Sequence, residues 1–201
     1  AGLGGGTGTG VVPVVAQEAK RAGALVIAIV SMPFHIERRQ RMQRALEGLE
    51  KLRIACDAVL VLDNNRLLHY VPNLPLDEAF SIMDQLIAEI VKGIVETITL
   101  PSLINLDFAD VTTIMSGMGI AIMGTGVGHG ETKAVDAATK AVSSPLLEDA
   151  SVDGARGVII NVTGGPDLSL VEVSEATSII HAAAHEDANI IFGVVIDPDM
   201  A

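Results

Sequence analysis

Aromatic side chains are scarce in this 201-residue sequence, which has four Phe, one Tyr and no Trp. Hydrophobic residues still make up 49% of the chain, so it is not intrinsically disordered, and its core must be built from aliphatic side chains. The length allows one large domain or two small ones. The single cysteine, Cys56, excludes a disulfide framework and a multi-cysteine zinc site, and is typical of a reducing compartment.

Basic residues are also few, with 13 Lys and Arg against 25 Asp and Glu, which gives a formal net charge of −12. This balance opposes binding to nucleic acid or to an anionic membrane, and a bound phosphate would need local donors. Of the two long uncharged stretches, 24–36 is too short to span a membrane. The other, 111–130, contains six glycines, so we expect no membrane insertion.

The first part of the chain alternates between helix and strand patterns. We predict helices over 11–22 and 37–52, and buried strands over 24–31 and 58–62. The ten residues before the first helix are expected to form a loop. Such alternation is typical of an α/β fold with a doubly wound parallel sheet.

A long helix is predicted over 76–98, with an apolar surface wide enough to be buried between two layers or domains, and Pro101 ends it. A second α/β unit is expected to follow. The division is 1–75 for the first domain, 76–100 for the connecting helix and 101–201 for the second domain. We predict helices over 111–116, 132–142 and 169–184, and strands over 120–126, 157–163 and 189–196. Ser169 and Glu172 are expected to form a capping box at the start of the last of these helices.

The segment Gly4–Gly10 reads Gly-Gly-Gly-Thr-Gly-Thr-Gly and runs directly into the first predicted helix. Glycines let the backbone approach an anion, and N–H groups at the start of a helix bind phosphate. The segment lacks the Lys-Ser/Thr end of a P-loop and fits the dinucleotide fingerprint poorly. A purely structural loop is the weaker interpretation of five glycines and two threonines in seven residues.

This segment resembles the glycine signature of the tubulin/FtsZ superfamily of GTPases. Residues 105–111, Asn-Leu-Asp-Phe-Ala-Asp-Val, are similar to the acidic catalytic loop of FtsZ, the prokaryotic cell-division family. Residues 143–147 and 154–157 are also similar, and the resemblance covers the whole chain in the same order. It implies a partial doubly wound GTPase domain, a long central helix and most of a second α/β domain with a mixed sheet.

The resemblance also implies a GTP or GDP site. Glu37 would accept hydrogen bonds from the ribose and Arg41 would lie near ribose and phosphate, whereas Asn64 and Asp84 would read guanine. A carboxylate can accept two hydrogen bonds from the guanine N–H pair, which adenine cannot supply. The expected phosphate contacts are Gly5, Gly6, Thr7, Gly8, Thr9 and Gly10.

Asp107 and Asp110 are the expected catalytic residues. At i and i+3 they share one face, where they can orient water and, with Mg²⁺, act on the γ-phosphate. Helix capping, above all by Asp110, is the structural alternative. In the FtsZ family this loop completes the site of the next subunit, so the resemblance implies head-to-tail filaments of a cytoplasmic, mid-cell division ring. Membrane-tethering and regulatory partners would bind a tail that this sequence lacks.

Other interpretations stay open at this stage. Another tubulin-like filament GTPase, for DNA segregation or cell shape, shares the glycine signature, and a dinucleotide-dependent oxidoreductase or a nucleotide-free scaffold are alternatives from other classes. His181 and His185 are one helical turn apart but lack a third ligand, so no metal site is assigned. The second glycine-rich segment, 124–130, is followed by Glu131 and is interpreted as structural.

The chain starts without Met inside its most glycine-rich segment, and we expect it to be an internal piece of a longer protein. The strand and phosphate loops that would precede Ala1 are then missing. We therefore expect this piece alone neither to bind GTP tightly nor to hydrolyse it.

Overall fold

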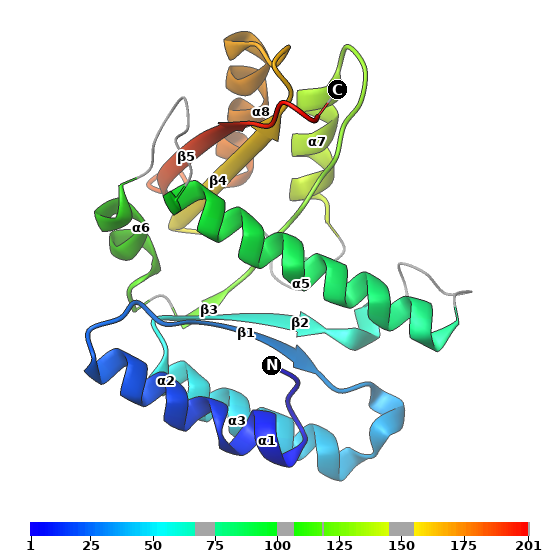
Figure 1. Cartoon of the computed structure of the whole chain (residues 1–201), viewed down its shortest axis with the longest axis vertical. Coiled ribbons are helices and arrows are strands. Elements are labelled where there is room, and N and C mark those ends of the chain that lie inside the picture. Colours follow the sequence, from blue (N-terminus) through cyan, green and yellow to red (C-terminus); the bar gives the residue numbers. More distant parts are fainter. Residues whose placement is uncertain (67–74, 100–106, 118, 145–154, 201) are drawn as a thin grey trace. The chain divides into compact units, whose positions relative to one another are not determined.

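The computed structural model describes residues 1–66, 75–99, 107–117, 119–144 and 155–200. The chain divides into two compact units. Unit 1 contains residues 1–87 and 115–122, and unit 2 contains 88–114 and 123–201. The long helix α5 (Leu76–Thr99), predicted from the sequence, contributes to both units (Figure 1).

Unit 1 is built on a parallel sheet with strand order β1-β2-β3, as the alternating sequence pattern predicted. Its strands are β1 (Ile27–Met32), β2 (Ala58–Asp63) and β3 (Gly119–Ala121). Three helices lie on one face of this sheet (Figure 1). They are α1 (Gly6–Gly10), α2 (Val12–Arg21) and α3 (Arg39–Ala55).

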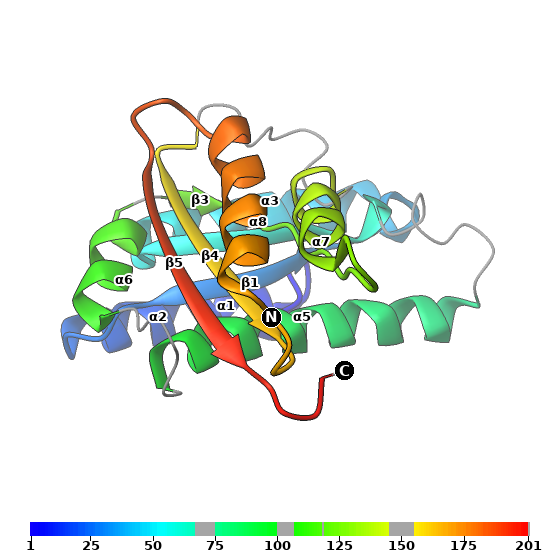
Figure 2. The same cartoon turned by 90° about the horizontal axis from the view of Figure 1, so that it is seen from above.

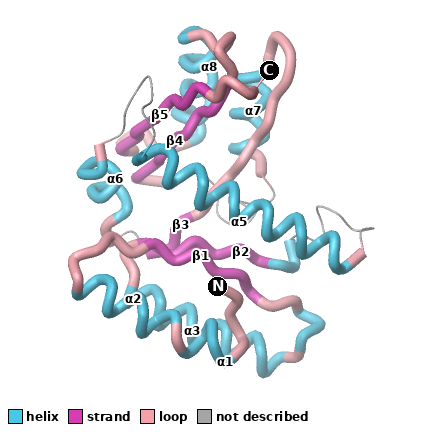
Figure 3. Tube along the Cα trace, in the orientation of Figure 1, coloured by secondary structure: helices cyan, strands magenta, loops and turns pink. Residues whose placement is uncertain are grey.

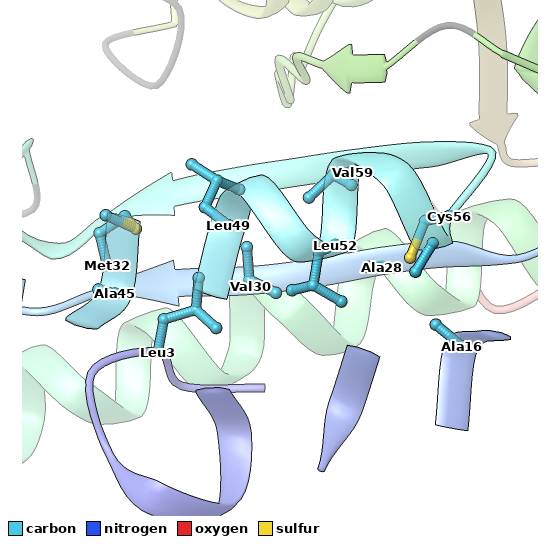
Figure 4. Close-up of a cluster of buried hydrophobic side chains, with 11 residues drawn as sticks. Leu3, Ala16, Ala28, Val30, Met32, Ala45, Leu49, Leu52, Cys56 and Val59 are labelled. Atoms are coloured by element: carbon cyan, nitrogen blue, oxygen red, sulfur yellow. The ribbon is translucent and has the colours of Figure 1, made fainter. Parts of the chain in front are cut away.

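The core of unit 1 is aliphatic, as the scarcity of aromatic residues requires. Side chains from β1 and β2 meet those of α2, α3 and the N-terminal segment (Figure 4). Val30, Leu52 and Val59 are fully buried in it. Cys56 belongs to this cluster as a small buried core residue. The remaining members are Leu3, Ala16, Ala28, Met32, Ala45, Leu49 and Ala55.

The prediction that residues 1–10 form a loop is wrong in its second half, because Gly6–Gly10 is helical. The amide of Val11 donates to the carbonyl of Thr7 at 2.9 Å, so the helical turn continues up to α2. Pro13 lacks an N–H group and cannot extend this pattern, which separates α1 from α2. The helix therefore begins within the glycines themselves.

Unit 2 contains a parallel pair of strands, β4 (Gly157–Gly164) and β5 (Asn189–Ile196), joined through α8 (Leu170–Ala183). Helix α8 packs against α7 (Lys133–Val142) (Figure 2). The predicted capping box is confirmed, since Ser169 Oγ accepts from the Glu172 amide and Glu172 reaches back to the Ser169 amide. The strands described in this unit are parallel, and the expected mixed sheet is not seen in these residues.

The predicted strand over 120–126 is mostly wrong, because β3 ends at Ala121 and the chain then runs as a loop to α7 (Figure 3). Glycines explain this path. A Cβ atom at Gly126 would lie 2.0 Å from the Ala137 carbonyl oxygen, and one at Gly128 would lie 1.8 Å from that of Lys133. The loop therefore passes directly against the backbone of α7. Among the described residues, no helix is long and apolar enough to cross a membrane.

Candidate nucleotide site

The glycine segment of unit 1 presents open backbone at the start of a helix. Gly5 is the N-cap of α1, and no side chain caps the free amides of the first turn. A Cβ atom added at Gly5, Gly6 or Gly10 would meet no atom within 4 Å. The space beside these three glycines is therefore available to a ligand, and helix N-terminal amides favour an anionic one.

The same segment is held in place by contacts among its own residues. The amide of Gly4 donates to Thr9 Oγ1 at 2.9 Å, and Gly4 has a φ of +94°, which a side chain would strain. Gly8 passes so close to Gly2 that a Cβ atom would lie 1.9 Å from the Gly2 carbonyl oxygen. Thr7 is exposed. Gly8 and Thr9 thus shape the segment, whereas Thr7 is open to a ligand.

Arg41 lies against this segment, and Glu37 is paired with Arg41. Glu37 Oε1 accepts from the Phe34 amide at 2.9 Å, and its Oε2 pairs with Arg41 Nη1 at 2.9 Å. The Arg41 stem reaches the glycine segment, because a Cβ atom at Gly4 would lie 2.7 Å from Arg41 Cγ. The guanidinium is half exposed, so it keeps donors for an anion.

Asn64, expected to read guanine, is buried at the end of β2 with 8% of its surface exposed. Its Oδ1 atom has no hydrogen-bond partner among the residues that the structure describes. A buried acceptor without a partner is costly, and such an atom calls for a functional explanation. Asp84, on the first half of α5, is exposed. It lies one turn after Phe80, whose ring contacts that of Phe34 at a centroid distance of 5.6 Å.

Asn65 was not recognised as important from the sequence. Its Oδ1 accepts from the His35 amide at 2.7 Å, while its Nδ2 donates to the Pro33 carbonyl and to Asp63 Oδ1. Asn65 therefore ties the end of β2 to the segment that carries Glu37. A side chain that satisfies backbone groups 30 residues away leaves no local sequence pattern, so no signal could have found it.

Arg38 is a second residue that sequence analysis missed. It has a φ of +80°, in the left-handed region that non-glycine residues rarely adopt. It joins the short 3₁₀ helix His35–Glu37 to α3. The turn at Arg38 thereby sets the direction from which Glu37 and Arg41 meet the glycine segment.

Asp107 and Asp110 lie in unit 2, at the start of α6 (Phe108–Met115), and both are exposed. The carbonyl of Asp107 accepts from the Asp110 amide at 3.0 Å, and its Oδ1 accepts from the Ala109 amide at 3.2 Å. Asp107 thus occupies the capping position predicted for Asp110, which lies in the first turn. The side chain of Asp110 has no role in holding the described part of this helix.

The remaining candidates do not form a site. His185 Nδ1 accepts from the Asp187 amide at 3.1 Å, which favours the surface interpretation of His181 and His185. Within the described residues, no cluster of three His, Cys, Asp or Glu side chains could hold a metal ion. Pro101, Asn105, 145–147 and Gly154 lie outside the described residues.

Known proteins match this chain in both units. The GTPase-domain model of the tubulin/FtsZ family matches residues 1–72, and the C-terminal-domain model of the FtsZ family matches residues 119–201. Cell division protein FtsZ 1 of Archaeoglobus fulgidus is 50% identical over 99% of this chain and 54% of its own length. For cell division protein FtsZ 2 of Haloferax volcanii, the identity is 52% over 99% of this chain and 49% of that protein.

Solved structures agree with these matches. An empty FtsZ dimer from M. jannaschii matches with a TM-score of 0.93 and 45% identity, over 99% of this chain and 58% of the other. CetZ1 from Haloferax volcanii, a GDP-bound monomer, matches with a TM-score of 0.81 over 99% and 59% of the chains; at 19% identity this likeness shows the fold alone. The chain belongs to the FtsZ family of the tubulin/FtsZ GTPases. It spans about half the length of the relatives that it matches.

Proposed function

We propose that this chain is part of a GTP-binding and GTP-hydrolysing protein that polymerises into cell-division filaments. The observation that carries the proposal is the uncapped glycine segment at the start of α1, with open space beside Gly5, Gly6 and Gly10. Two relatives at about half sequence identity are named cell division proteins. The proposed location is the cytoplasm at the division site, with tethering and regulatory partners bound elsewhere in the longer protein.

The guanine base is proposed to meet Asn64 and Asp84. The Asn64 side chain has a buried acceptor atom without a partner, and Asp84 has an exposed carboxylate. Guanine presents an N–H pair to a carboxylate, and adenine does not. Glu37 is proposed to accept from the ribose, and the Arg41 guanidinium to contact ribose and phosphate, with Mg²⁺ assisting at the phosphates.

Hydrolysis is proposed to use Asp107 and Asp110 from a neighbouring subunit. The two carboxylates are exposed at the start of α6, where Asp110 is free to orient a water molecule. A site completed by the next subunit requires head-to-tail contact, which builds open filaments. The 201-residue piece alone is proposed to be inactive and to bind GTP weakly.

The GTPase rate of the full-length protein, measured against protein concentration, tests this function. Completion of the site between subunits predicts a threshold concentration, below which the rate per subunit falls towards zero. A rate strictly proportional to concentration would contradict it.

A mixing experiment sharpens the test. We expect Asp110→Asn and Asn64→Ala variants each to lose hydrolysis, the first because it lacks the catalytic carboxylate and the second because it lacks nucleotide. In a mixture, an Asp110→Asn subunit with bound GTP can meet the intact acidic loop of the Asn64→Ala variant. We expect hydrolysis to reappear only in the mixture. Failure to reappear while filaments form would contradict catalysis in trans.

A further inference from the structure

Helix α3 contains a buried glycine at position 48, between the core residues Ala45 and Leu49. Glycine in the interior of a helix is destabilising relative to alanine, so its presence there needs a reason. A Cβ atom at Gly48 would lie 2.6 Å from Thr9 Cγ2, and 3.4 and 3.5 Å from Thr9 Cβ and Cα. The missing side chain thus makes room for Thr9 of the glycine segment.

Thr9 cannot turn away from α3 without disturbing the segment that it belongs to. Its Oγ1 accepts from the Gly4 amide at 2.9 Å, and this bond fixes the side-chain rotamer. Rotation would relieve the contact at Cγ2 only by moving Oγ1 away from Gly4. The Cβ and Cα atoms of Thr9 would lie at ordinary contact distance from the added atom, so Cγ2 is the atom that excludes a side chain at position 48.

A second contact holds the other end of the segment against the same helix. Gly4 lies against Arg41, where a Cβ atom would be 2.7 Å from Arg41 Cγ and 2.9 Å from its carbonyl oxygen. Arg41 and Gly48 are seven residues apart, which places them on one face of α3 about two turns from each other. Helix α1 also packs on α3.

We propose that Gly48 is a positioning residue for nucleotide phosphate. Its lack of a side chain lets Thr9 seat the glycine segment directly on α3, and this sets where the free amides at the start of α1 point. Gly48 itself touches no nucleotide. The inference rests on the proposed function, because it deepens the account of the same site.

The test is a double-mutant cycle in the full-length protein, with affinity measured by titration of a fluorescent GDP analogue. Gly48→Ala is expected to weaken binding at least about tenfold, because displaced amides lose their alignment with the phosphates. In the Thr9→Ser background, which removes Cγ2 and keeps the hydroxyl, the same change is expected to cost less than about twofold. Competition by guanosine, which has no phosphates, should be unaffected by Gly48→Ala.

Gly93→Ala serves as the matched control. Gly93 is also in a helix interior, but its added Cβ would lie 3.5 Å from Asn161 Nδ2, an ordinary contact, so affinity should not change. If Gly48→Ala fails to fold, recovery of folding and GDP binding in the Gly48→Ala/Thr9→Ser double variant supports the proposal.

Equal losses in both backgrounds, no loss in either, an equal loss for guanosine, or a double variant that does not recover would each overturn it. If the unsubstituted protein does not bind GDP, that result would instead contradict the proposed function itself.

Discussion

The two glycine-rich segments of this chain, 4–10 in unit 1 and 124–130 in unit 2, have similar composition but use their glycines differently. In the first, Gly5, Gly6 and Gly10 face open space, while Gly4 and Gly8 allow close contacts within unit 1. In the second, Gly126 and Gly128 pass so close to the carbonyls of α7 that no side chain fits. The three open glycines of the first segment therefore leave room for a ligand, whereas Gly126 and Gly128 allow the chain to pack against a helix.

The comparison extends to neighbouring asparagines at the end of β2. Asn65 satisfies three backbone or side-chain partners, whereas Asn64 keeps a buried Oδ1 atom without one. A side chain whose polar atoms all form hydrogen bonds within the fold contributes to stability. A buried side chain with an unpaired polar atom is a candidate for a role in function. Substitutions at the two kinds of position should therefore separate stability from binding.

The largest effect is expected for Gly128→Ala. Its Cβ atom would lie 1.8 Å from a backbone oxygen of α7, which cannot rotate away, so the loop or the helix must move. We expect the free energy of unfolding to fall by about 3 kcal/mol. Urea denaturation followed by circular dichroism measures this, and unchanged stability would remove the contrast between the two segments.

The opposite outcome is expected for Gly6→Ala. Open space and a helical backbone favour alanine there, so stability should stay the same or rise by up to about 1 kcal/mol. Affinity for GDP should fall about tenfold, because a methyl group enters the space proposed for phosphate. Gly126→Ala is the matched control, and it is expected to lower the free energy of unfolding. A Gly6→Ala variant that binds as tightly as the unsubstituted protein would contradict the phosphate assignment.

The two asparagines offer the next contrast. Asn65→Ala should lower the free energy of unfolding by about 2 kcal/mol, because it leaves the His35 amide without its acceptor. Asn64→Ala should leave stability unchanged and weaken guanine nucleotide binding. Thermal unfolding and GDP titration of both variants check this, and equal effects in the two assays would show that the distinction is wrong.

The smallest effect concerns Asp57, which joins the start of β2 to Val26 before β1 and to Lys20 of α2. The Val26 amide donates to its carboxylate at 3.0 Å and Lys20 pairs with it at 2.9 Å, and both lower the pKa of Asp57. A lowered folded-state pKa means that the carboxylate stabilises the fold above its ordinary pKa of about 4, and that this is lost as pH falls through the folded value.

Asp57→Asn should therefore cost about 1 kcal/mol at neutral pH, and the difference from the unsubstituted protein should shrink in acid. Urea denaturation of the variant and of the unsubstituted protein, at neutral pH and in acid, measures this difference in the free energy of unfolding. A difference that grows as the pH falls would contradict the assignment.

The sequence predicted most of the fold because its aliphatic runs and helical periods are strong local signals. Strand β5 and the Ser169 capping box were predicted as found. The helical start at Gly6 and the loop after β3 were not, because tertiary contacts override the local tendencies of glycine and of the apolar run 120–123. Asn65 and Gly48 act through contacts distant in sequence, and Arg38 adopts a left-handed conformation that arginine rarely takes, so no local pattern could reveal them.

The central claim is that unit 1 carries a site selective for guanine nucleotides, formed by the glycine segment, Glu37, Arg41, Asn64 and Asp84. Displacement of a fluorescent GDP analogue from the full-length protein tests it most directly, with GTP, ATP and NAD as competitors. We predict that GTP displaces the analogue stoichiometrically, and that ATP and NAD do not at the same concentration. Equal displacement by ATP or NAD, or no binding of the analogue, would contradict the claim.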